Sequence, residues 1–300
     1  MRYLISLPEA AADLSDLAPG MYDGDVPLPS QAELDEVEFY ALPYGFKPET
    51  VAHIARMPRL RVVQALTAGY EHVLPHLREG LTLANAKGVH DASTAELALA
   101  LTLAAQRNIA GYVRAGDRGE WAKDWRPSLA DANVLIVGYG SIGEAIERRL
   151  AGFEVNVRRV ARTARPGVEP ISEIAGILPW ADVVILITPL TEETRGLAGK
   201  EFLASMRTGA LLVNVARGPV VDTDALVAEL ESGRLRAALD VTDPEPLPAG
   251  HPLWRAPNVL ISPHVGGLTS AFVPRARKLV VAQARRYEAG EPLVNVVWPA

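Results

Sequence analysis

The stretch from Asn133 to Gly143 reads NVLIVGYGSIG. Its first five residues are a Val/Ile/Leu-rich run of the kind that forms a strand buried on both faces. The rest has the spacing G-x-G-x-x-G and opens a predicted helix over Ser141–Leu150. In that context Gly138 permits a tight turn, Gly140 lets the backbone approach a pyrophosphate, and Gly143 lets the helix pack on the strand. The stretch predicts a dinucleotide-binding unit; a structural turn without a ligand is the alternative.

Strands and helices keep alternating after this stretch. Further strands are predicted at Glu154–Val160, Asp182–Ile187, Leu211–Val215, Ala237–Val241 and Val259–Ser262. A helix is predicted over Asp222–Ser232, because Gly233 stands where a left-handed residue commonly ends a helix. Apolar strands separated by helices predict a parallel sheet that is covered on both faces.

The first ninety residues alternate in the same way. Predicted strands lie at Tyr3–Leu7, Glu38–Leu42, Arg61–Leu66 and Leu81–Ala84, with a helix at Pro48–Met57. This alternation predicts a second parallel sheet, so the fold class is α/β.

The segments between and after the two sheets are also distinctive. Ser93 and Glu96 have the spacing of a capping box, which predicts the start of a helix. The run from Leu97 to Ile109 is apolar on nearly every face, so we expect it to be buried at a seam between domains or subunits. Asp117–Pro127 is predicted to be a connecting loop, and Ala271–Ala289 a last helix before an extended tail.

Length and composition limit the class of protein. A chain of 300 residues favours two domains. There are 30 Lys and Arg against 36 Asp and Glu, and this net charge of −6 argues against a nucleic-acid partner or an anionic membrane surface. The chain has no cysteine, which excludes disulfides, thiolate metal sites and cysteine nucleophiles. No segment resembles a signal peptide or a membrane span. We therefore expect a cytoplasmic protein that uses no metal.

The strand predicted after the glycine-rich turn indicates which dinucleotide, NAD or NADP, the protein binds. In NAD-binding proteins an acidic residue about 20 positions after the glycines holds the ribose diol. Here that place is taken by Ala161, and four arginines crowd the strand and its end: Arg158, Arg159, Arg162 and Arg165. Because an arginine there suits the 2′-phosphate of NADP, NADP(H) is favoured over NAD(H). A solvated basic surface is the alternative, since arginine alternating with apolar residues also fits an ordinary strand.

The last three predicted strands end in residues that carry chemistry, Arg217, Glu245 and His264. Ligands of open parallel sheets bind outside the carboxyl ends of the strands, so these side chains should converge where a nicotinamide would lie. The Arg217 guanidinium suits a carboxylate and an adjacent carbonyl, and His264 suits proton transfer near neutral pH. Glu245 would orient the imidazole and stabilise its charged form. Individually each has a plain structural alternative; their joint placement favours catalysis.

At this point the sequence resembles the D-isomer-specific 2-hydroxyacid dehydrogenases, over nearly its whole length. The motifs that carry the resemblance are GYGSIG at 138–143, PLTEETRGL at 189–197, VNVARGPVVD at 213–222, ALDVTDPEPLP at 238–248, HPLW at 251–254 and NVLISPHVGG at 258–267. By this resemblance Arg217, Glu245 and His264 match the family's catalytic set.

The resemblance also implies a fold and a set of binding residues. It implies a Rossmann cofactor domain at residues 100–268, inserted into a discontinuous flavodoxin-like substrate domain at 1–99 and 269–300. The cofactor contacts it implies are Gly138, Gly140, Ser141, Ile142, Gly143, Arg162, Thr163, Thr188, Pro189, Ala216, Arg217, Asp240, His264 and Gly266. The substrate contacts it implies are the backbone amides of Ala68, Gly69 and Tyr70, with Arg217 and His264. It further implies a homodimer formed through the helix at Ser93–Ile109.

Within the family, the chain is similar to the glyoxylate/hydroxypyruvate reductases, which tend to use NADPH and reduce a small 2-oxo acid to a D-2-hydroxy acid. These enzymes place a tryptophan in the partner subunit's pocket, a part that Trp121 or Trp125 could take; a structural tryptophan in a dimer contact is the alternative. Glu245 stands where formate-oxidising members have Gln, and Ala68 where phosphite-oxidising members have Lys, which disfavours both activities. The side-chain selectivity of the pocket would depend on Tyr44, Tyr70 and His72. A nucleotide-sensing corepressor with the same fold is the alternative from another class.

Overall fold

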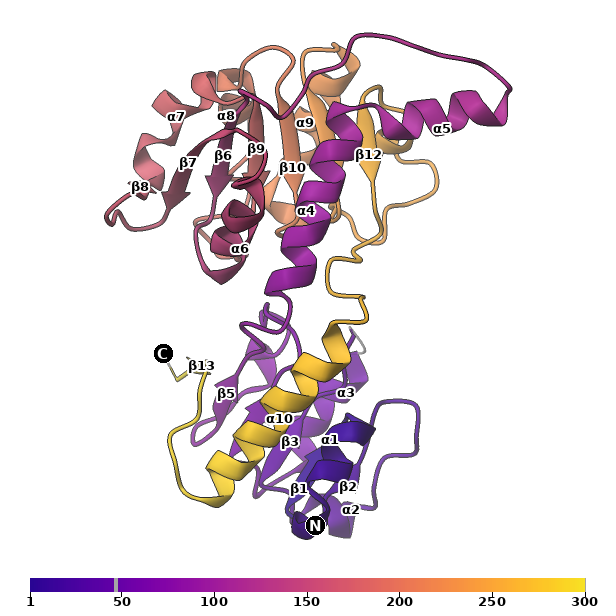
Figure 1. Cartoon of the computed structure of the whole chain (residues 1–300). Helices are drawn as coiled ribbons and strands as arrows, with labels where there is room; N and C mark the ends of the chain where they lie inside the picture. The colour runs from indigo at the N-terminus through magenta and orange to yellow at the C-terminus, as the bar shows by residue number, and fades with distance from the viewer. Residues whose placement is uncertain (46–47, 300) are drawn as a thin grey trace. The chain divides into compact units, whose positions relative to one another are not determined.

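Two sheets organise the chain in the computed structural model, which describes residues 1–45 and 48–299. The first unit comprises Met1–His90 and Thr269–Ala300, and the second comprises Asp91–Leu268. Each unit is an α/β layer structure built on its own sheet, as the alternating pattern predicts (Figure 1).

The second unit is a parallel sheet of seven strands in the order β12-β11-β10-β9-β6-β7-β8. The strands are β6 (Asn133–Val137), β7 (Asn156–Ala161), β8 (Glu169–Pro170), β9 (Val183–Leu186), β10 (Leu211–Asn214), β11 (Arg236–Leu239) and β12 (Val259–Ile261). The helices are α4 (Asp91–Gln106), α5 (Ile109–Asp117), α6 (Ser141–Leu150), α7 (Ile174–Ile177), α8 (Lys200–Ser205) and α9 (Thr223–Glu231).

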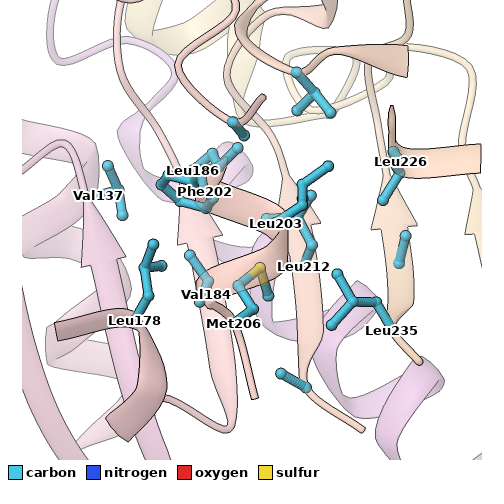
Figure 2. Close-up of a cluster of buried hydrophobic side chains, with 14 of the residues drawn as sticks. Val137, Leu178, Val184, Leu186, Phe202, Leu203, Met206, Leu212, Leu226 and Leu235 are labelled. Carbon is cyan, nitrogen blue, oxygen red and sulfur yellow. The ribbon is translucent and has the colours of Figure 1, made fainter. Parts of the chain in front are cut away.

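Alternate residues of each central strand pack on opposite faces of this sheet. In β6, Leu135 and Val137 belong to the cluster formed with α8 and α9, whereas Val134 and Ile136 belong to the cluster formed with α4 and α6. Figure 2 shows the first cluster, in which Phe202 and Leu203 of α8 lie against the side chains of the strands. Both faces are therefore dry, which explains the unbroken apolar composition of the strands.

The first unit is a sheet of six strands in the order β13-β5-β4-β3-β1-β2, parallel except for the antiparallel edge strand β13. The strands are β1 (Tyr3–Ile5), β2 (Gly20–Met21), β3 (Phe39–Ala41), β4 (Val62–Gln64), β5 (Thr82–Ala84) and β13 (Val296–Trp298). The helices are α1 (Pro8–Asp13), α2 (Gln31–Leu34), α3 (Pro48–Ala52) and α10 (Phe272–Glu288). Helices α1 and α10 cover one face, with Ala276, Val280 and Ala284 of α10 fully buried.

The helix α4 differs from expectation at both ends. It begins at Asp91, so the capping box expected at Ser93 was wrong: Ser93 and Thr94 are buried inside the helix. It ends at Gln106, because Asn108 adopts a left-handed conformation with φ 55° and a separate helix, α5, follows. Helix α4 packs along its length on the second unit's sheet and on α6. The chain therefore crosses between units at His90–Asp91, ahead of the expected boundary at residues 99/100.

Within the second unit, α5 and the loop that follows it extend away from the sheet (Figure 1). Ile109 and Val113 lie one turn apart on α5 and are exposed, and Trp121 and Trp125 in the loop are almost entirely exposed. Across the described residues, no helix combines the length and the hydropathy needed to span a bilayer.

Candidate active site

The glycine-rich turn between β6 and α6 is tight at two of its glycines and open at the third. Gly138 has φ 101°, and a Cβ there would lie 2.6 Å from the carbonyl oxygen of Ile187. A Cβ on Gly143 would overlap the carbonyl oxygen of Gly138, so only glycine lets α6 start this close to the strand. Around a Cβ on Gly140 there is no atom within 4 Å from the described residues beyond its chain neighbours. Gly140 thus marks the place where the backbone is accessible to a ligand, at the amino end of α6.

An unsatisfied hydroxyl lies just after β9, the strand that pairs with β6 in the sheet. Thr188 follows β9, and its Oγ1 is buried without a hydrogen-bond partner among the described residues. Buried polar groups normally have a partner, so this hydroxyl points to a polar ligand beside it. The main chain of Gly138 approaches Thr188, since a Cβ on Gly138 would lie 2.8 Å from the Thr188 nitrogen. The residues present therefore fit a dinucleotide along the turn and the adjoining strand end.

The four arginines near the end of β7 have different partners. Arg158 forms a two-pronged ion pair with Glu169, and Arg159 pairs with Glu147 of α6. Arg165 donates to the backbone carbonyl of Tyr139 and lies over its ring, with the guanidinium carbon 5.5 Å from the ring centroid. Arg162 is exposed and forms no hydrogen bond or ion pair with any described residue.

A network of charged and polar side chains on α6 and β7 holds Tyr139 of the glycine-rich turn in place. Glu147 accepts hydrogen bonds from Arg159 Nε, at 2.7 Å, and from the Tyr139 hydroxyl. The Arg159 guanidinium is the main cause of a lowered Glu147 pKa, to which the Tyr139 hydrogen bond adds. Burial and the Glu147 contact raise the pKa of Tyr139, so its hydroxyl stays protonated and donating. The turn residue Tyr139 is therefore held by both its hydroxyl and its carbonyl.

The segment that carries Arg217 is shaped by a buried asparagine and a glycine. Asn214, at the end of β10, accepts from the amide of Ala216 at 3.0 Å and donates to the carbonyl of Arg217 at 3.1 Å. A Cβ on Gly218 would collide with the carbonyl of Thr242. Glycine thus allows the Arg217 segment to lie against Thr242, which begins the loop that carries Glu245.

Glu245 and His264 meet directly. Nδ1 of His264 lies 2.5 Å from Oε1 of Glu245, and both side chains are partly exposed. His264 has φ 53°, an uncommon left-handed conformation for a residue with a side chain, and its amide donates to the carbonyl of Asp240 at 2.7 Å. The structure thus brings all three predicted catalytic residues to the carboxyl edge of the second unit's sheet, with Glu245 and His264 in contact.

Asp240 and Gly266 are engaged with each other. The Asp240 carboxylate is buried, and one of its oxygens accepts the Gly266 amide at 3.0 Å. Both residues were expected at the cofactor; in the structure they also support the loop that carries His264.

The segment Ala68–Tyr70 belongs to the first unit. The carbonyl oxygens of Ala68, Gly69 and Tyr70 accept hydrogen bonds from Asn85 Nδ2, Thr67 Oγ1 and the Val73 amide, respectively. Within the described part of the chain, the three backbone amides donate to no acceptor. This arrangement leaves a row of N–H groups, which is what an anion such as a carboxylate requires.

Two polar residues of the site were not predicted from the sequence. Asn214 shapes the Arg217 segment, and Ser262 donates to Asp240 Oδ1 at 2.5 Å. The available signal was their position, since each is a polar residue within or just after an apolar strand.

A pyrophosphate-binding turn and a histidine–carboxylate pair on one edge of a parallel sheet are what an NAD(P)-dependent oxidoreductase requires. The family model for "D-isomer specific 2-hydroxyacid dehydrogenase, NAD binding domain" matches residues 99–266. The chain belongs to this family, as the motifs predict, and its second unit contains the NAD(P)-binding domain.

Individual relatives agree with this assignment. The chain is 37% identical over 227 residues to the glyoxylate reductase/hydroxypyruvate reductase of Mus musculus, covering 70% of this chain and 68% of the relative. It is 37% identical over 237 residues to glyoxylate/hydroxypyruvate reductase B of Citrobacter koseri, covering 74% and 73%. A solved D-isomer specific 2-hydroxyacid dehydrogenase from Xanthobacter autotrophicus, in complex with NADPH and MES, superposes with a TM-score of 0.81 at 31% identity, covering 99% and 98%.

Proposed function

We propose that the protein is an NADP(H)-dependent reductase of small 2-oxo acids, of the glyoxylate/hydroxypyruvate type, that forms D-2-hydroxy acids. The observation that carries this proposal is the 2.5 Å contact between His264 and Glu245 at the sheet edge that also presents Arg217. The similarity to glyoxylate and hydroxypyruvate reductases supports the substrate class.

Arg217, His264 and Glu245 have separate roles in the proposed reaction. The Arg217 guanidinium binds the substrate carboxylate and polarises the adjacent carbonyl. The bound nicotinamide supplies the hydride that the carbonyl carbon accepts. His264 donates a proton to the carbonyl oxygen, and Glu245 holds the ring through Nδ1. In the opposite direction the neutral imidazole accepts the hydroxyl proton.

The NADP(H) preference rests on Arg162. Three neighbouring arginines are bonded to Glu169, Glu147 and Tyr139. Among the described residues, Arg162 has only a longer-range charge interaction with Glu193, so its guanidinium can still bind a 2′-phosphate. The other residues that would hold the cofactor are Gly138, Gly140, Ser141, Ile142, Gly143, Thr163, Thr188, Pro189, Ala216, Arg217, Asp240, His264 and Gly266.

The first unit would serve as the substrate domain. Its row of amides at Ala68, Gly69 and Tyr70, unpaired among the described residues, is suited to bind a carboxylate. Side-chain selectivity would come from Tyr44, Tyr70 and His72.

A homodimer would involve α4, α5 and the loop that carries Trp121 and Trp125. The exposed apolar side chains of Ile109, Val113 and both tryptophans support this proposal, because such patches usually mark a protein contact.

The decisive experiment is turnover with glyoxylate, hydroxypyruvate, pyruvate and phenylpyruvate, each with NADPH and with NADH. We expect the highest kcat/KM for glyoxylate or hydroxypyruvate with NADPH. Oxidation of NADPH with none of the four acids would refute the proposal and favour a nucleotide-sensing regulatory protein. A higher kcat/KM with NADH would refute the cofactor preference alone.

A further inference from the structure

The buried carboxylate of Asp240 binds the loop of His264 at three points. Ser262 Oγ donates to Oδ1 at 2.5 Å, the Val265 amide donates to Oδ1 at 2.9 Å, and the Gly266 amide donates to Oδ2 at 3.0 Å. These are its hydrogen-bond donors among the described residues, and Asp240 itself is only 4% exposed. A buried carboxylate depends on such donors, because burial without them is costly.

The three donors surround His264 in sequence. Ser262 precedes it by two positions, and Val265 and Gly266 follow it directly. The His264 amide also donates to the Asp240 carbonyl, at 2.7 Å. One aspartate thus binds the chain on both sides of the catalytic histidine, through its carboxylate and its backbone.

The hydrogen bonds to Asp240 hold the loop of His264 in an uncommon backbone conformation. His264 has φ 53°, which residues with a side chain rarely adopt unless their surroundings impose it. A Cβ on Gly266 would lie 3.1 Å from Asp240 Oδ2, so glycine is what lets the loop close this tightly on the carboxylate. The ring of His264 reaches Glu245 from that backbone conformation.

We propose that Ser262 is a positioning residue for His264, acting through Asp240. Its hydroxyl orients the Asp240 carboxylate, which in turn holds the amides of Val265 and Gly266 and keeps the imidazole against Glu245. The inference rests on the proposed role of His264 in proton transfer. Removing the hydroxyl leaves the buried carboxylate one donor short, so it turns or admits water, and the histidine loop relaxes.

Steady-state kinetics test the proposal with three variants. S262A should lower kcat about tenfold or more, with KM for the 2-oxo acid within about threefold of wild type, because misplacing a reacting group costs rate more than binding. S262T keeps the hydroxyl and should recover kcat to within about threefold. S205A is the matched control: Ser205 Oγ donates to the Glu201 carbonyl at 2.8 Å at the end of α8, and its loss should leave kcat unchanged.

Two kinetic results would overturn the proposal. One is an S262A enzyme with wild-type kcat. The other is equal impairment of S262A and S262T, which would mean that the site tolerates only serine for reasons of packing.

A second measurement does not depend on turnover. In ¹⁵N-labelled protein, the proton shared by His264 Nδ1 and Glu245 should give a downfield signal, assigned by its absence in H264A. We expect its exchange with water to be at least tenfold faster in S262A than in wild type or S262T. Unchanged exchange in S262A would refute the positioning role even in an active enzyme. Faster exchange in a protein that reduces no 2-oxo acid would uphold it while refuting the proposed function.

Discussion

The imidazole of His264 is oriented by Glu245 across a separation of 19 residues, with Nδ1 2.5 Å from the carboxylate. The contact uses Nδ1, so proton exchange with a substrate would use Nε2. The pair belongs to two loops at adjacent strand ends, since β11 and β12 are neighbours in the sheet. Parallel pairing of these strands is what makes residues remote in sequence work together.

Replacement of His264 by alanine tests the proton donor. H264A should lower kcat by about 10²–10⁴-fold, because a positioned acid/base group typically contributes that factor. NADPH binding, measured by fluorescence titration, should stay within about threefold. The control is H251A, since His251 Nδ1 accepts from the Leu253 amide in a short turn at some distance along the chain. Equal losses of kcat and NADPH affinity in H264A would indicate a structural histidine.

Gly140 tests the approach of the cofactor to the backbone. Gly140 has φ −96°, which alanine can adopt, and no described residue outside its chain neighbours lies within 4 Å of a Cβ there. G140A should therefore unfold at the same temperature as wild type, while NADPH binds about tenfold more weakly because the methyl group occupies the place of the pyrophosphate. Unchanged affinity for NADPH would show that the dinucleotide does not approach this glycine.

Replacement of Gly218 tests a glycine that the packing of the protein requires, whereas Gly140 leaves room for a ligand. A Cβ at Gly218 collides with the backbone of Thr242. G218A should lower the free energy of unfolding by about 1–3 kcal/mol and also reduce kcat, because the segments carrying Arg217 and Glu245 are pushed apart. Chemical denaturation and turnover assays measure the two effects. A G218A protein of wild-type stability would contradict the close approach.

Arg162 tests the cofactor preference. R162A should lower the affinity for NADPH at least tenfold, in keeping with the loss of about 1.5–3 kcal/mol for a charged hydrogen bond, and leave NADH affinity nearly unchanged. R158A is the matched control, because Arg158 is already paired with Glu169. Titration of both variants with both dinucleotides gives the comparison. Equal weakening of NADPH and NADH in R162A would rule out a 2′-phosphate contact.

Glu147 predicts a pH dependence of stability. Its pKa is lowered from an ordinary value of 4.5, chiefly by the Arg159 hydrogen bond. A lowered carboxyl pKa stabilises the folded state above the unfolded pKa, and this contribution is lost as the pH falls through the folded pKa. E147Q should therefore cost about 1 kcal/mol at neutral pH, and the difference from wild type should shrink below about pH 4.5.

Urea denaturation of wild type and E147Q between pH 7 and pH 3 measures this difference. E144Q is the control, because Glu144 lies exposed on the same helix. A wild-type advantage that persists unchanged to pH 3 would contradict the assigned role of Glu147.

The sequence predicted most accurately those elements that local chemistry determines. The strand Asn133–Val137 and the helix Ser141–Leu150 were located to the residue, because a buried apolar run and three glycines delimit them. Gly233 was likewise confirmed as left-handed, with φ 73°. Short elements such as β2 and β13 were missed, since strands of two or three residues are defined by their neighbours in space rather than by their own composition.

In the candidate site, too, residue types could be predicted from the sequence, whereas contacts between distant residues could not. Residue types at strand ends pointed to Arg217, Glu245 and His264, but the parts of Asn214 and Ser262 depend on hydrogen bonds that spacing does not reveal. Four arginines near β7 look equivalent in the sequence. Only their acidic and aromatic partners, contributed by other elements, separate Arg162 from the rest.

The discontinuity of the first unit has a consequence for biosynthesis. Its sheet includes β13, and one face of the sheet is covered by α10. A buried hydrogen bond of 2.8 Å from Gln283 of α10 to Gln64 of β4 links the carboxyl-terminal segment to residues 1–90. On the ribosome, residues 1–90 emerge first but must wait for these last elements, whereas Asp91–Leu268 is complete before them. Because domains generally fold as units during synthesis, the unit translated first would be the last to mature, with the nucleotide-binding unit already folded by then.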